Sequence, residues 1–301
     1  MKLAFNTGLY QKAGYSIEYA LDRLKYNGFD VIDFVCYGDF KPQSRPVSEQ
    51  LRIEKKLQQL DLQAHTAIYL PRCNNPGAAS KEERLACVEE MKPTGEFIKR
   101  IGGRFLMFCE ATGRPDYATN VDKRQAFDNS IDTIKRVCEW ADKIGIHVFL
   151  ELIPYGGNLD SCEAMKEALD RVKAPNLWAN IDLGHCGLQK INGKRFSLLG
   201  DKLINLHISD NDNTGDEGWI MEDDAIIGEG NADLKGYFEE ISKLDLDANA
   251  RKSGIKGLDE CVVTIECSDL AGCPNPDYSV VRCRDYVLTH LPYFSDPKPR
   301  S

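Results

Sequence analysis

The chain has 301 residues, which is long for an average domain but suits an α/β barrel, since such barrels use roughly 250 residues as one unit. Hydrophobic residues at 42% and charged residues at 28% are ordinary globular usage and exclude a fibrous or disordered architecture. The net charge of -9 argues against nucleic acid as a partner, because binding a polyanion draws on Lys and Arg. We therefore expect a single catalytic domain over residues 1–301 that acts on a small molecule.

The N-terminus and the cysteines indicate where the protein works. The first residues carry one charge and a short apolar run, which is too short for a signal sequence or a membrane span of roughly 20 residues. The eleven cysteines are odd in number, scattered, and without a C-x-x-C pair, which is typical of free thiols. These features predict a cytoplasmic protein that does not contact membranes.

Short β-rich runs alternate with amphipathic segments from one end of the chain to the other, which is typical of βαβ units. Strands are expected at 3–7, 30–35, 62–65, 103–109, 146–151, 177–182, 203–208 and 261–266. Helices are expected at 16–27, 48–60, 81–100, 122–144, 160–172, 231–244 and 277–291, with a weaker one at 195–201. Eight strands with crossover helices predict an α/β fold, the (β/α)8 TIM barrel. We interpret the polar stretch 245–260 as an insertion.

Four consecutive predicted strands end in a polar residue that can bind a metal: Glu151, Asp182, His207 and Glu266. One such residue would mean little, because a charged residue often marks the point where a strand meets solvent. In a barrel, however, the carboxyl ends of the strands converge on one mouth, where active sites form. The sequence therefore predicts a metal site built from all four residues.

Three carboxylates and one imidazole favour Mn²⁺, with Mg²⁺, Co²⁺ and Zn²⁺ also compatible. A metal there can hold a carbonyl and a neighbouring hydroxyl, polarise the carbonyl, and stabilise the enediolate that forms when the adjacent carbon loses a proton. Glu151 and Glu266 are the expected catalytic acid and base groups, because they could approach a substrate from opposite sides.

Several motifs resemble one family. They are Asn180-Ile181-Asp182-Leu183-Gly184-His185, Leu206-His207-Ile208-Ser209-Asp210-Asn211, Gly228-Glu229-Gly230-Asn231 and Thr264-Ile265-Glu266. Their order and spacing resemble the xylose isomerase-like TIM barrels, which include sugar phosphate isomerases and epimerases, ketose 3-epimerases, and inosose dehydratases. The resemblance implies the same four metal ligands, acid/base roles for the two Glu residues, and substrate binding by His185. It also implies a substrate-binding role for His65, which is expected to close the third strand.

Two positions depart from the ketose 3-epimerases within that family. Those enzymes carry an Arg shortly after the strand-seven His, whereas residues 212–217 contain none. They also carry an acidic residue after the strand-five Glu, near the position of Asn158 in this chain. The Gly228-Glu229-Gly230 turn is interpreted as a lid or rim loop, because a lone G-x-G is poor evidence for phosphate binding.

The expected function is a metal-dependent isomerase or epimerase of a small polyhydroxy ketone or aldehyde. The first alternative is a lyase of the same fold, either a dehydratase or a subunit that cleaves 3-oxo-glycosides or C-glycosides. A DNA-repair endonuclease and a non-catalytic sugar-binding barrel are further alternatives, and the acidic charge opposes the endonuclease. The expected partners are a carbohydrate-like substrate and further copies of the chain, with a small second subunit compatible with the lyase.

Overall fold

The computed structural model describes residues 1–38, 41–71, 73–110, 121–153, 158–211, 225–267 and 275–295. Its eight parallel strands follow one another in chain order and close into a barrel, as the sequence predicts. The strands are β1 (Lys2–Asn6), β2 (Val31–Val35), β3 (Gln63–Tyr69), β4 (Phe105–Cys109), β5 (His147–Glu151), β6 (Leu177–Asp182), β7 (Leu203–Ile208) and β8 (Val262–Ile265).

Helices follow most of the strands, in keeping with the expected βα alternation. They are α1 (Gly8–Lys12), α2 (Ile17–Tyr26), α3 (Val47–Gln59), α4 (Lys81–Arg100), α5 (Lys123–Ile144), α6 (Cys162–Val172), α7 (Leu183–Leu188), α8 (Leu234–Ile241), α9 (Leu246–Lys252), α10 (Pro276–His290) and α11 (Pro292–Ser295), with 3-10 helices η1 (Pro42–Ser44) and η2 (Gly193–Lys202). Among the described residues, none of these helices is both long enough and apolar enough to cross a membrane.

The chain divides into two compact units. One unit is Val31–Asn180 and holds β2 to β5 with most of β6, while the other combines Met1–Asp30 with Ile181–Ser301 and holds β1, β7 and β8. The expectation that residues 1–301 act as one catalytic domain stays a prediction.

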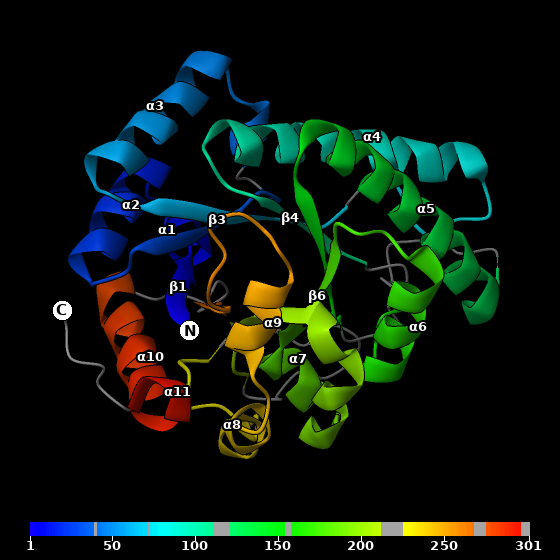
Figure 1. Cartoon of the computed structure of the whole chain (residues 1–301). Helices are drawn as coiled ribbons and strands as arrows, with labels where there is room; N and C mark the ends of the chain where they lie inside the picture. The colour runs from blue at the N-terminus through cyan, green and yellow to red at the C-terminus, as the bar shows by residue number, and fades with distance from the viewer. Residues whose placement is uncertain are drawn as a thin grey trace. The chain divides into compact units, whose positions relative to one another are not determined.

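In the Val31–Asn180 unit, the strands are apolar because both of their faces are covered. Phe105 of β4 stacks on Phe149 of β5 with ring centroids 4.2 Å apart. The helices α4, α5 and α6 lie side by side along this part of the sheet (Figure 1). Helix α5 begins where Asp122 accepts a hydrogen bond from the Gln125 amide and ends at Gly145, whose φ of 74° is the left-handed geometry that glycine adopts readily.

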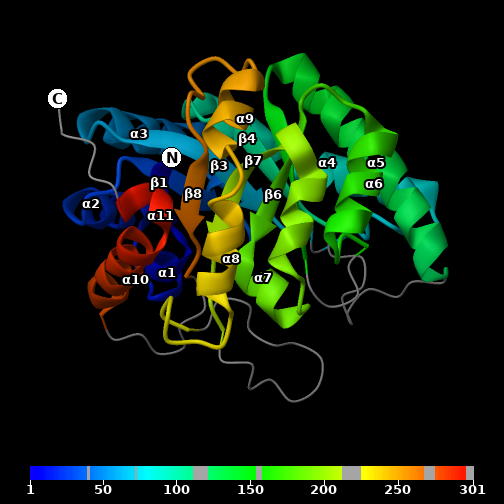
Figure 2. The same ribbon diagram turned by 60° about the horizontal axis from the view of Figure 1, so that its bottom comes forward.

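In the other unit, β8 pairs with both β1 and β7. Helix α10 is fastened to α1 and α2 through Asp277, which accepts hydrogen bonds from the Tyr10 hydroxyl at 2.5 Å and from Arg23 Nε at 2.9 Å. Figure 2 shows α10 running into α11 next to α1. The buried N-terminal ammonium group of Met1 pairs with Asp247 at 2.9 Å, which ties the start of β1 to α9.

The structure departs from the sequence-based boundaries in three places. Strand β3 continues to Tyr69, so the prediction that it ends at residue 65 was wrong. Residues 183–188 form the short helix α7, which was expected to be a loop because it contains Gly184 and Gly187. Part of the presumed insertion 245–260 is helix α9, which begins where Asp245 accepts a hydrogen bond from the Ala248 amide. Local capping supports both helices, and in α7 it does so although two glycines disfavour a helix.

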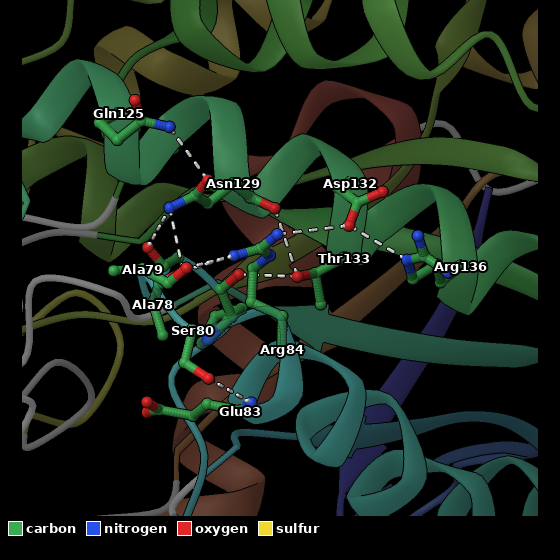
Figure 3. A network of polar contacts seen from close by, with 12 residues as sticks. Ala78, Ala79, Ser80, Glu83, Arg84, Gln125, Asn129, Asp132, Thr133 and Arg136 are labelled. Atoms are coloured by element: carbon green, nitrogen blue, oxygen red, sulfur yellow. Dashed lines mark hydrogen bonds and ion pairs between the residues drawn. The ribbon is translucent and has the colours of Figure 1, made fainter.

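The loop that follows β3 is fastened to α4 and α5 by side chains (Figure 3). Arg84 Nη1 donates to the carbonyls of Ala78 and Ala79 at 2.8 and 3.0 Å, and Asn129 Nδ2 donates to the Ala78 carbonyl at 2.9 Å. Buried Thr133 donates its hydroxyl to the Pro76 carbonyl at 2.7 Å. The backbone carbonyls of this irregular segment are thereby satisfied by neighbouring helices, which holds the loop in one conformation.

Replacing Thr133 with Val should lower the free energy of unfolding by about 1–3 kcal/mol, because the Pro76 carbonyl would lose its buried donor. The measurement is urea unfolding followed by circular dichroism. Thr289→Val is the matched control, because Thr289 also donates to a helix carbonyl at 2.7 Å but is exposed, so water replaces the bond. Equal effects of the two substitutions would contradict the role of the loop contact.

Candidate metal centre

Asp182 is the last residue of β6, and its side chain serves both the fold and the candidate site. Its Oδ1 atom accepts hydrogen bonds from the His185 amide at 2.9 Å and from the Ser209 hydroxyl at 2.6 Å, so it caps helix α7. Its Oδ2 atom is buried and has no hydrogen-bond partner among the residues that the structure describes. A buried carboxylate oxygen costs free energy unless something compensates its charge, and a bound cation would do so.

His207 of β7 and Glu266 at the end of β8 lie together. The Glu266 amide still donates to the Ile208 carbonyl at 2.9 Å, so the residue stays in line with the strand. His207 Nδ1 lies 2.6 Å from Glu266 Oε2, and both residues are buried. This buried imidazole–carboxylate pair can share a cation.

Glu151 is the last residue of β5 in the Val31–Asn180 unit and is 2% exposed. Its Oε1 atom accepts a hydrogen bond from Asn180 Nδ2 at 3.0 Å. Its Oε2 atom accepts one from Cys109 Sγ, also at 3.0 Å. The neighbouring strands β4 and β6 therefore hold this carboxylate.

The four residues predicted from the sequence are brought together. Glu151, Asp182, His207 and Glu266 each offer one ligand atom, and these atoms lie within 4.8 Å of one another. Three carboxylates and an imidazole are a chemically suitable donor set for a divalent cation, and the uncompensated Asp182 oxygen fits one. These four residues could hold a metal ion.

The position two residues after Asp182 requires a glycine, Gly184, because Ser209 packs against it. A Cβ atom at this position would lie 2.1 Å from Ser209 Oγ and 2.9 Å from the Ser209 carbonyl carbon and oxygen. Only glycine therefore allows Ser209 to approach Asp182 and donate its hydrogen bond. Within the motif that contains Asp182, Gly184 and His185, the glycine is therefore needed for packing, whereas Asp182 and His185 carry the polar side chains.

Asp210 organises the turn at Gly228-Glu229-Gly230. Its carboxylate accepts four backbone hydrogen bonds at 2.9 to 3.1 Å, from the amides of Asn211, Gly228, Gly230 and Ala232. Burial raises the pKa of Asp210, and these four donors oppose that shift. A Cβ atom on Gly230 would lie 2.3 Å from Asp210 Oδ1, so the glycine is required. The amides of this turn bind a carboxylate of the protein itself, which agrees with a rim loop.

The other four histidines lie in four different settings. His185 is in α7 and 5% exposed, while His65 is the third residue of β3, packed 4.8 Å from the Phe105 ring and 6.0 Å from the Phe149 ring. The prediction that His65 closes its strand was wrong, because the apolar run continues to Tyr69. Substrate contact by His65 or His185 stays a prediction. His147 begins β5, and His290 lies exposed late in α10.

Sequence reasoning missed several residues near the strand ends. Cys109 and Asn180 contact Glu151, and buried Glu110 accepts hydrogen bonds from the Asn158 amide at 2.7 Å and from the Ser130 hydroxyl at 2.8 Å. Glu110 directly follows β4, so its place after a predicted strand could have marked it as a residue near the mouth of the barrel. The segment 212–217, with its missing Arg, lies outside the described residues.

Gly184→Ala should destabilise the protein by about 1–3 kcal/mol, because the new methyl group overlaps Ser209. The measurement is the free energy of unfolding in urea without added metal. Gly187→Ala, on the same helix, is the comparison and should cost less, because its Cβ atom would lie 3.0 Å from the Ala232 side chain instead of 2.1 Å from a neighbour. A Gly184→Ala protein as stable as the unchanged chain would contradict the packing argument.

Comparisons with known proteins place the chain in a family. The fructoselysine 3-epimerase of Escherichia coli O157:H7 is 33% identical over 114 residues, which cover 36% of this chain and only 39% of that enzyme. A D-tagatose 3-epimerase-like protein matches with a TM-score of 0.73 at 18% identity over 98% of both chains. The IolI protein, solved with a zinc atom, matches with a TM-score of 0.76 at 16% identity over 98% of this chain and 99% of that one.

The family described as "Xylose isomerase-like TIM barrel" matches residues 21–249, which is most of the chain. The structural matches above share the barrel fold. The chain therefore belongs to the xylose isomerase-like TIM barrel family.

Proposed function

We propose that this protein is a divalent-metal-dependent epimerase or isomerase of a small sugar-like ketone or aldehyde. The observation that carries the proposal is the gathering of one imidazole and three carboxylates, with ligand atoms within 4.8 Å of one another. The family supports it, and so does the likeness of part of the chain to fructoselysine 3-epimerase. The acidic net charge suits a substrate that is not a polyanion.

Glu151, Asp182, His207 and Glu266 would hold the cation, for which the oxygen-rich donor set favours Mn²⁺. When bound, the cation would polarise a substrate carbonyl and acidify the adjacent C–H bond. Glu151 and Glu266 are the proposed proton carriers, because a carboxylate within reach of that carbon can take its proton and the other can return one. Return of the proton to the opposite face gives an epimer.

His185 is the proposed substrate-binding residue beside Asp182. The His185 amide donates a hydrogen bond to the carboxylate of Asp182, which is a proposed metal ligand. The position of His185 is therefore tied to the proposed metal site. His65 is the second proposed substrate-binding residue. Its ring packs against the rings of Phe105 and Phe149, so a substrate that touches His65 would also lie near these two aromatic side chains.

Elimination is the second candidate, because two features differ from the ketose 3-epimerase pattern. Residues 212–217 lack an Arg, and Asn158 stands near the expected acidic position. In the structure, Asn158 donates hydrogen bonds to Glu110 from both its backbone and its side-chain nitrogen, at 2.7 and 3.1 Å. Both reactions begin with loss of a proton next to the carbonyl, and they diverge afterwards.

Incubation in D2O with Mn²⁺ and either fructoselysine or D-tagatose tests the proposal. NMR should show solvent deuterium entering the carbon next to the carbonyl, and EDTA should abolish this exchange. Appearance of an epimer identifies an epimerase, whereas loss of water or of a substituent identifies the lyase. Turnover of a substrate without exchange of that C–H bond would contradict the proton-transfer mechanism.

Glu266→Gln should reduce the exchange rate at least about 100-fold, because the substitution removes a charged ligand and a proton carrier. The barrel should still fold, since the Glu266 amide keeps its bond to Ile208. His290→Gln is the control, because His290 is exposed on α10. Near-normal exchange by Glu266→Gln at saturating Mn²⁺ would exclude the proposed role.

A further inference from the structure

Three residues form a row across neighbouring strands at the carboxyl ends of β4, β5 and β6. Cys109 pairs in register with Glu151, and Glu151 pairs in register with Asn180. In-register residues of parallel neighbours project their side chains from the same face of the sheet. The thiol and the amide therefore flank the carboxylate from its two sides.

The hydrogen bonds within this row divide the Glu151 carboxylate between two donors. The Asn180 amide donates to Oε1 and the Cys109 thiol donates to Oε2, each at 3.0 Å. Asn180 is fully buried, Cys109 is 4% exposed, and Glu151 is 2% exposed. Because each oxygen accepts a hydrogen bond from a different strand, rotation of the carboxylate about its terminal bond would break both of these bonds at once in a site that water scarcely reaches.

The backbone that follows Glu151 is held from the same strand end. Glu110, the residue after Cys109, accepts the Asn158 amide at 2.7 Å, and the Ile153 amide donates to the Leu159 carbonyl at 3.1 Å. Glu110 thereby holds Asn158, while Cys109, the residue before it, contacts the Glu151 side chain. The position and the orientation of Glu151 are thus set separately.

We infer that Cys109 and Asn180 are positioning residues, which orient the Glu151 carboxylate for cation binding and proton transfer. The inference rests on the proposed function, in which Glu151 is a ligand and a proton carrier. Hydrogen-bond partners of metal ligands fix ligand orientation, and their loss weakens metal affinity by about 10–100-fold. In this chain, one of these partners is a thiol.

Calorimetric titration of the metal-free protein with Co²⁺ tests the inference without a substrate. Cys109→Val removes the thiol donor and adds one methyl group, and Asn180→Leu removes the amide donor while keeping the branched shape of the side chain. Both should weaken Co²⁺ binding about 10-fold or more, whereas Cys109→Ser, which restores a donor, should return close to the original affinity. Cys87→Val, at a buried cysteine of α4, is the matched control and should bind Co²⁺ unchanged.

The melting temperature of each metal-free variant separates orientation from packing. The inference is overturned if both Cys109→Val and Asn180→Leu bind Co²⁺ as tightly as the unchanged protein, or if they lose only thermal stability. If one variant does not fold, the affinity of the other decides. Failure of the unchanged protein to bind Co²⁺ would instead overturn the proposed cation site, and the inference with it.

Discussion

The burial of carboxylates at the carboxyl ends of the strands is the constraint on which the rest of the site depends. A charged oxygen removed from water must be compensated by donors or by a cation. Asp210 is compensated by four backbone amides, and Glu110 by Asn158 and Ser130. Asp182 accepts its hydrogen bonds on Oδ1, and among the described residues its Oδ2 atom has no hydrogen-bond partner. That oxygen is suited to a cation, although the same side chain also caps α7.

The same residues serve the fold and the site. Asp182 caps α7 through the oxygen that Ser209 also contacts, and Gly184 makes room for that contact. Asp210 shapes the turn at Gly228-Glu229-Gly230 only three residues after His207. Substitutions in these motifs should therefore affect stability and chemistry together, and metal affinity has to be measured alongside unfolding to tell the two apart.

Sequence patterns predicted the barrel and the four proposed ligands because both depend on local signals. Eight apolar runs alternate with amphipathic segments, and Glu151, Asp182, His207 and Glu266 each close such a run. The environment of those ligands could not be predicted, because Cys109 and Ser130 are defined as partners only by strand register and packing. His65 was misplaced because an apolar stretch offers no mark of where a buried strand ends, and β3 continues to Tyr69. Capping likewise supports α7, where two glycines disfavour a helix, and α9, which lies in the stretch interpreted as an insertion.

The central claim is that one divalent cation binds to Glu151, Asp182, His207 and Glu266. A crystal grown with Mn²⁺ and measured at a wavelength where manganese scatters anomalously tests it directly. The account predicts one strong anomalous peak, with an atom of each of the four side chains about 2.0–2.6 Å away and Asp182 contributing Oδ2. A peak elsewhere, or four side chains that do not share an ion at saturating Mn²⁺, would contradict it.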